Sequence, residues 1–152
     1  MSDNEWYDMY GEKNTQYRSG TVFSDLVGIT LSKIIFNKNP GTDRYSSDTL
    51  LFYSVDGRTF RMAHYQDCCE DVHVEDITGD LDDLLNSPIV LAEEVSNITD
   101  KPEDASYDDS FTWTFYKLAT TKGYVTIRWL GTSNGYYSER VDFTELRTTQ
   151  GE

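Results

Sequence analysis

The feature that most constrains the fold is a pair of short strand-like runs joined by two residues. The runs are Thr49–Val55 (TLLFYSV) and Arg58–Tyr65 (RTFRMAHY), and only Asp56-Gly57 separates them. An Asp-Gly loop between such runs favours a β-hairpin with a type I′ turn, in which both loop residues take positive φ. The sequence therefore predicts antiparallel β-structure at the centre of the chain.

Similar short runs, separated by turn residues, recur on both sides of this hairpin. Two segments favour one or two helical turns, residues 21–28 ending at Gly28, and 80–85 capped by Thr78 or Asp80. We expect an α+β fold with a largely antiparallel, meander-rich sheet of about seven strands. The domain is expected to span 21–147, between a flexible arm at 1–20 and a frayed tail at 148–152. The further expected strands are 29–35, 72–77, 88–96, 111–119, 124–130 and 136–143.

The negative charge is concentrated in one region. The net charge is −14, and residues 62–100 contain 11 acids and no Lys or Arg. A chain this acidic repels phosphate backbones and anionic lipid, so binding to nucleic-acid polymers and membrane surfaces is disfavoured. The flanking regions are nearly neutral, which leaves their few Arg residues able to hold a small anion.

The sequence lacks the marks of export or membrane insertion. The first residues are polar and acidic, and no apolar run is long enough to span a bilayer, so we expect a soluble, cytoplasmic protein. Its two cysteines, Cys68 and Cys69, are adjacent, and we expect them to be unbridged small core residues.

No cofactor or metal motif is recognised. The acids of 76–83 do not follow the order of a calcium-binding loop, and adjacent cysteines lack zinc-site spacing. A thiolate from Cys68 or Cys69 with His64 as base would make an enzyme, but nothing in the sequence supplies an oxyanion donor or an ordered triad. We therefore expect a protein that is not an enzyme.

The C-terminal third carries a dense cluster of aromatic and polar side chains. Aromatic faces stack on bases, Arg forks pair with phosphates, and a Ser-Asn-Gly loop offers donors to an anion. The alternative is that Trp113, Phe115 and Trp129 are core and that Asn134-Gly135 is a hairpin turn. The candidate ligand-binding residues are His64, Trp113, Tyr116, Arg128, Trp129, Ser133, Asn134, Tyr136, Tyr137 and Arg140.

Several stretches together resemble a family of small acidic proteins, encoded mainly by bacteriophages and prophages, known as a domain of unknown function. The resemblance covers roughly residues 24–144 and implies no catalytic residues. It implies a context, because small phage accessory proteins often counter host defence. The stretches are HYQDCCE (64–70), GDLDDL (79–84), AEEV (92–95), TWTFY (112–116), GYVTIRW (123–129) and SNGYYSE (133–139).

Two hypotheses follow. The leading one is an anti-defence protein that sequesters a nucleotide second messenger, such as a cyclic nucleotide or an ADP-ribose derivative, without cleaving it, with a homo-oligomer completing the site. Arg128, Arg140, Ser133 and Asn134 would meet the phosphates, while Trp129, Tyr136 and Tyr137 would stack. The alternative is an acidic DNA mimic that inhibits a host nucleic-acid-acting defence enzyme, through Asp80, Asp82, Asp83, Glu93 and Glu94.

Overall fold

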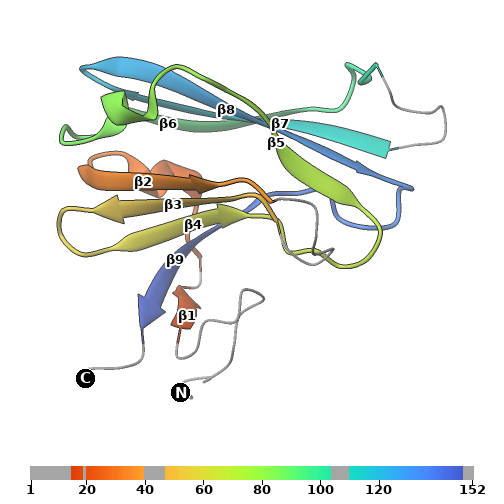
Figure 1. The fold of residues 1–152 in the computed structure, drawn as a ribbon, viewed down its shortest axis with the longest axis horizontal. Coiled ribbons are helices and arrows are strands. Elements are labelled where there is room, and N and C mark those ends of the chain that lie inside the picture. Colours follow the sequence, from red (N-terminus) through yellow and green to blue (C-terminus); the bar gives the residue numbers. More distant parts are fainter. Residues whose placement is uncertain (1–14, 19, 40–46, 104–109, 149–152) are drawn as a thin grey trace.

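The protein folds into two layers of β-sheet, as a computed structural model shows (Figure 1). The structure describes residues 15–18, 20–39, 47–103 and 110–148. Within these ranges it contains nine strands and two single-turn 3₁₀ helices, with no α-helix. The fold is therefore mostly antiparallel β, and the expectations of an α+β class and about seven strands are corrected. None of the described helices is long and apolar enough to cross a membrane.

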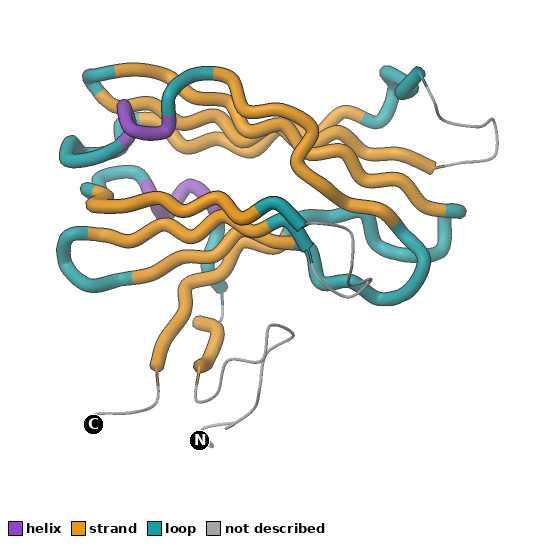
Figure 2. The backbone as a smooth tube through the Cα atoms, viewed as in Figure 1, coloured by secondary structure: helices purple, strands orange, loops and turns teal. Residues whose placement is uncertain are grey.

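Each layer is one antiparallel sheet, and Figure 2 shows the strands of both running across the molecule. The lower sheet has the order β1-β9-β4-β3-β2 and the upper sheet the order β5-β8-β7-β6. The lower strands are β1 (Thr15–Arg18), β2 (Leu31–Asn37), β3 (Thr49–Ser54), β4 (Thr59–Ala63) and β9 (Asp142–Thr148). The upper strands are β5 (Asp71–Thr78), β6 (Leu91–Asn97), β7 (Ser110–Thr120) and β8 (Gly123–Ser133).

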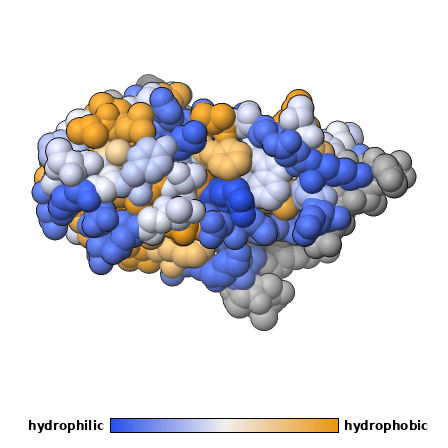
Figure 3. All heavy atoms as spheres, turned by 90° about the horizontal axis from the view of Figure 1, so that it is seen from above, coloured by the Kyte–Doolittle hydropathy of each residue, from blue (hydrophilic) through white to orange (hydrophobic). Residues whose placement is uncertain are grey.

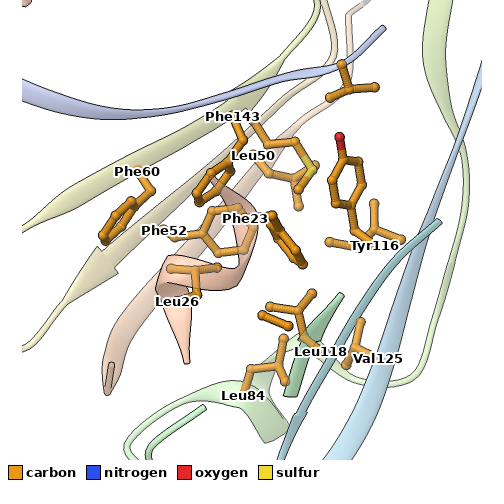
Figure 4. Close-up of a cluster of buried hydrophobic side chains, with 14 of the residues drawn as sticks. Phe23, Leu26, Leu50, Phe52, Phe60, Leu84, Tyr116, Leu118, Val125 and Phe143 are labelled. Carbon is orange, nitrogen blue, oxygen red and sulfur yellow. The ribbon is translucent and has the colours of Figure 1, made fainter. Parts of the chain in front are cut away.

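The core lies between the sheets and is rich in aromatic side chains (Figure 4). Phe23 lies at its centre, with its ring centroid 4.7 Å from that of Tyr116 and 5.2 Å from that of Phe143, both in edge-to-face geometry. Phe60 stacks on Phe143 at 5.7 Å. Edge-to-face aromatic pairs add about 0.5–1.5 kcal/mol each to the burial of apolar area. Phe23 therefore joins side chains of the two sheets.

The predicted hairpin is present as β3 and β4, but its turn differs from the prediction. Gly57 has a φ of 93°, whereas Asp56 does not have a positive φ. The Gly57 N–H donates to the Ser54 carbonyl at 3.2 Å, which closes a four-residue turn. A four-residue turn that ends at a glycine with positive φ is the usual form of a hairpin loop one residue longer than the predicted two-residue loop. It requires positive φ at only one residue.

The two expected helices are reduced to 3₁₀ turns, η1 (Phe23–Leu26) and η2 (Leu81–Leu84). Asp80 caps η2 by accepting a hydrogen bond from the Asp82 N–H at 2.9 Å. Four-residue segments are too short for an α-helix to propagate, and tertiary packing of Phe23, Leu26 and Leu84 holds them instead.

The ends of the domain also differ from the prediction. The expected strand 136–143 is largely irregular, and β9 starts only at Asp142. Residues 15–18 of the expected arm form β1 beside β9, so this part belongs to the lower sheet. Residues 1–14 of the arm and 149–152 of the tail lie outside the described residues.

Candidate functional site

A cavity of about 670 Å³ opens on the outer face of the upper sheet, away from the core. Strands from the middle and both edges of the sheet line it, together with the loop that follows β6. Figure 3 views this side of the molecule, where hydrophobic and hydrophilic side chains are interspersed. The lining residues are Asp71, His73, Glu75, Asn97, Asp100, Lys101, Pro102, Glu103, Trp113, Phe115, Arg128, Leu130 and Thr132.

The period-two alternation of the strands places these side chains on one face. Along β8, Val125, Ile127 and Trp129 are buried toward the core, so Arg128 and its even-numbered neighbours point outward. In the register of the sheet, Phe115 lies opposite Arg128. The sequence of β7 and β8 therefore builds an apolar core face and a mixed aromatic and cationic outer face.

Arg128 and Trp113 make contact in this cavity. The guanidinium carbon of Arg128 lies 5.1 Å from the centre of the Trp113 ring, a cation–π arrangement. The Arg128 Nε is buried and has no hydrogen-bond partner among the described residues. A buried donor without a partner costs about 1–3 kcal/mol.

The loop after β6 fixes the position of Trp113. The Trp113 Nε1–H donates to the Asp100 carbonyl at 2.7 Å. The Asn97 Oδ1 accepts from the N–H groups of Thr99 and Asp100, at 2.8 and 3.0 Å. These hydrogen bonds hold the loop against the Trp113 indole. The aromatic wall of the cavity is therefore formed before any ligand binds.

His73 lies between two carboxylates at the β5 edge of the cavity. Its Nδ1 lies 3.1 Å from Asp71 Oδ1, and its Nε2 lies 2.8 Å from Glu75 Oε1. The carboxylates of Asp71 and Glu75 accept hydrogen bonds from His73, and these bonds raise the pKa of His73 above its ordinary value of 6.5. Burial acts in the opposite direction. In turn, the hydrogen bond from His73 lowers the pKa of Asp71. Residues two apart on a strand share a face, which is why 71, 73 and 75 meet.

Four of the sequence-predicted residues lie in or beneath the outer face. Arg128 and Trp113 meet in the cavity, as described. Trp129 and Tyr116 are fully buried between the sheets, and the Trp129 Nε1–H donates to Met62 Sδ at 3.3 Å. Burial also raises the pKa of Tyr116. This placement does not fit the stacking role expected for Trp129, since a ligand on the surface does not reach it.

Five other predicted residues lie at the last position of β8 (Ser133) or on the segment that follows it, outside the lining of the cavity. The Asn134 Oδ1 accepts from the Tyr136 N–H at 3.0 Å, and the Tyr136 and Tyr137 rings contact edge to face at 4.9 Å. The Ser133 Oγ donates to Glu139, and the exposed Arg140 lies 3.6 Å from Asp142. The structure thus separates this loop from Arg128.

His64 is also apart from the cavity and has structural partners. The His64 Nε2 lies 2.8 Å from Glu70 Oε2, and its Nδ1 lies 2.7 Å from the Arg140 carbonyl oxygen. Both ring nitrogens of the buried His64 therefore have partners. Through them, the end of β4 is held to the segment before β5, at Glu70, and to the segment before β9, at Arg140.

The Asp67 N–H donates to Glu70 Oε2 at 2.8 Å, and the Cys68 N–H donates to Glu70 Oε1 at 2.9 Å. Burial alone would raise the pKa of Glu70, but these hydrogen bonds and that from His64 lower it to about 2. Cys68 and Cys69 are joined by a disulfide, which corrects the expectation of two unbridged thiols. Cys69 is exposed and Cys68 is half-buried, so they are not core residues either.

The acids of 62–100 do not form one continuous face. Glu70 is buried and contacts His64. Asp71 and Glu75 lie on β5, and Glu93 and Glu94 on β6, which are the two opposite edges of the upper sheet. The cationic and aromatic side chains of β7 and β8 lie between these edges. This arrangement gives the DNA-mimic alternative no added support.

Part of the site was not anticipated from the sequence. His73 and Glu75 lie two residues apart in the predicted strand 72–77, so the pattern already placed them on one face, whereas Asp71 precedes that strand. Their proximity to Arg128 depends on the pairing of β5 with β8, which are about fifty residues apart in the chain.

The sequence was compared with known families, curated proteins and solved structures. A model of a family described as a domain of unknown function (DUF7448) matches residues 24–143. No curated protein and no solved structure matches. The matched range runs from η1 to the start of β9, so it contains every strand that lines the cavity. The chain therefore belongs to the DUF7448 family of domains of unknown function.

Proposed function

We propose that this protein binds and sequesters a nucleotide-type ligand in the cavity on the outer face of the upper sheet. The observation that carries the proposal is the buried, unpartnered Nε of Arg128 beside the Trp113 ring. The cavity volume of about 670 Å³ falls in the range of small-molecule sites. A nucleotide combines the two features that these side chains recognise, a planar ring and an anionic group.

Each part of the ligand has a partner in the cavity. The aromatic rings of Trp113 and Phe115 offer apolar surface to a base, and stacking on such a ring contributes roughly 1–3 kcal/mol per base. Arg128 provides the charge-assisted hydrogen bonds that hold a phosphate oxygen. Asn97 and Thr132 add polar groups at the walls. Of the binding residues predicted from the sequence, Trp113 and Arg128 line the cavity. The residues of the 133–140 loop do not, and residues of β5, β6 and β7 line it instead.

The residues in the cavity favour retention of the ligand over its cleavage. His73 is the lining group best suited to acid–base catalysis, but both of its ring nitrogens face carboxylates. It therefore has no unoccupied nitrogen to accept a proton from substrate or water. Together with the resemblance to phage proteins, this supports sequestration of a host immune messenger as the biological role.

Calorimetric titration with nucleosides, cyclic nucleotides and ADP-ribose derivatives tests the proposal. We expect at least one to bind tighter than millimolar, and Arg128→Gln to weaken it by about tenfold or more. Arg140→Gln is the matched control, because Arg140 lies in the 133–140 loop, and it should leave binding unchanged. Chromatography of the released ligand should recover it intact. Equal loss in both variants, or no binding by any compound, would contradict the proposal.

A further inference from the structure

The charges around the cavity restrict which nucleotides it accepts. Four carboxylates line it, from Asp71, Glu75, Asp100 and Glu103, against three cationic groups, from Lys101, Arg128 and protonated His73. The lining is therefore net negative even when His73 carries its proton. The whole chain, at −14, adds a repulsive background for any anion.

The cations are not equally placed to compensate an added phosphate. His73 is engaged by Asp71 and Glu75, one at each ring nitrogen. Arg128, by contrast, lies over Trp113 with a buried nitrogen that has no partner. Lys101 also has an interaction of its own. Arg128 is thus one guanidinium for one anionic group, and each further charge on a ligand lies close to the carboxylates of the lining, which repel it.

Resting on the proposed function, we propose that the cavity selects nucleotides that carry a single negative charge. A cyclic mononucleotide, whose phosphodiester bears one charge, fits this requirement. Open monophosphates, ADP-ribose derivatives, cyclic dinucleotides and nucleoside triphosphates carry more charge and are rejected. A neutral nucleoside would gain the stacking contact without the ionic bond to Arg128, so it binds more weakly.

A charge series built on one base tests this selectivity. For each of the common bases, calorimetry compares the nucleoside, the 3′,5′-cyclic monophosphate, the 5′-monophosphate and the 5′-triphosphate. We expect the cyclic monophosphate to bind tightest, with a loss of about tenfold for the 5′-monophosphate and a further loss for the triphosphate. In Arg128→Gln, the advantage of the cyclic monophosphate over the nucleoside should disappear.

A second variant tests the role of the carboxylates. Glu103→Gln removes one negative charge from the lining. It should therefore reduce the difference in affinity between the cyclic monophosphate and the 5′-monophosphate. Glu93→Gln also removes one negative charge, but from a residue of β6 outside the lining, so it is the matched control. It should leave that difference in affinity unchanged.

The outcomes separate this inference from the proposed function. A triphosphate or ADP-ribose derivative that binds as tightly as the cyclic monophosphate, with Arg128→Gln still weakening it, overturns the selectivity and leaves nucleotide binding standing. A nucleoside that binds as tightly as its cyclic monophosphate also overturns it, since Arg128 then recognises no phosphate. If neither the compounds of this series nor the ADP-ribose derivatives bind tighter than millimolar, the proposed function is wrong and the inference falls with it.

Discussion

Replacing Glu70 by glutamine tests the buried hydrogen-bonded carboxylate that holds the segment between β4 and β5. The side chain keeps its shape, but the carboxylate that accepts from His64, Asp67 and Cys68 is lost. The pKa of Glu70 is lowered from its ordinary 4.5 to about 2. At about 1.4 kcal/mol for each unit of pKa, the charged form contributes about 3 kcal/mol of stability at neutral pH.

The dependence on pH has a definite sign. Because the pKa in the folded state lies below that in the unfolded state, the stabilisation is complete above about pH 4.5 and is lost as the pH falls toward 2. We therefore expect Glu70→Gln to lower the free energy of unfolding by about 3 kcal/mol at pH 7. The difference from wild type should shrink to about half by pH 3.

Urea unfolding of both proteins from pH 7 to pH 3 measures this difference directly. Glu93→Gln, an exposed glutamate on β6, is the control and should change stability by less than about 0.5 kcal/mol. A Glu70→Gln protein as stable as wild type at pH 7 would refute the reasoning from the lowered pKa of Glu70. So would a difference between the two proteins that stays constant down to pH 3.

Three further predictions concern the core, the cavity and the cysteines. Phe23→Ala should lower the free energy of unfolding by about 3–5 kcal/mol in urea, because it removes the ring that joins the two sheets. NMR titration should place the pKa of His73 above 6.5, and the Asp71→Asn substitution should lower that pKa. The stabilisation that depends on protonated His73 is complete below about pH 6.5. It is lost as the pH rises through the pKa of His73 in the folded state. Mass spectrometry should find Cys68 and Cys69 closed to alkylation until a reductant is added, and labelling without reductant would contradict the disulfide.

Local patterns in the sequence predicted most of the strands. The Asp-Gly loop between two strand-like runs located β3 and β4. The alternation of apolar and polar residues located β5 and β7, because each of these strands buries one face against the other sheet. The pattern misplaced the last strand: the 136–143 segment alternates, but β9 starts only at Asp142 and pairs with β4 and β1. Sequence periodicity does not report which distant strand is available for pairing.

The site was predictable only in part for the same reason. Composition singled out Arg128 and Trp113, yet their neighbours in the chain, such as Tyr136, contribute to a separate loop. The acid–histidine group on β5 reaches the cavity through the non-local pairing of β5 with β8. The adjacent cysteines were expected to stay apart, because ring strain disfavours such a bridge, but the two sulfurs are bonded where the chain bends at Cys68 and Cys69.

The most direct test of the account is an NMR titration that follows the two tryptophans of the upper sheet. Trp113 lines the cavity, whereas Trp129 is fully buried in the core beneath it. With a cyclic mononucleotide, the indole N–H signal of Trp113 and the Nε–H signal of Arg128 should shift in proportion to the bound fraction, while the Trp129 signal stays in place. Shifts confined to Tyr136 and Tyr137, or none at all up to millimolar ligand, would contradict the assignment of the outer-face cavity as the binding site.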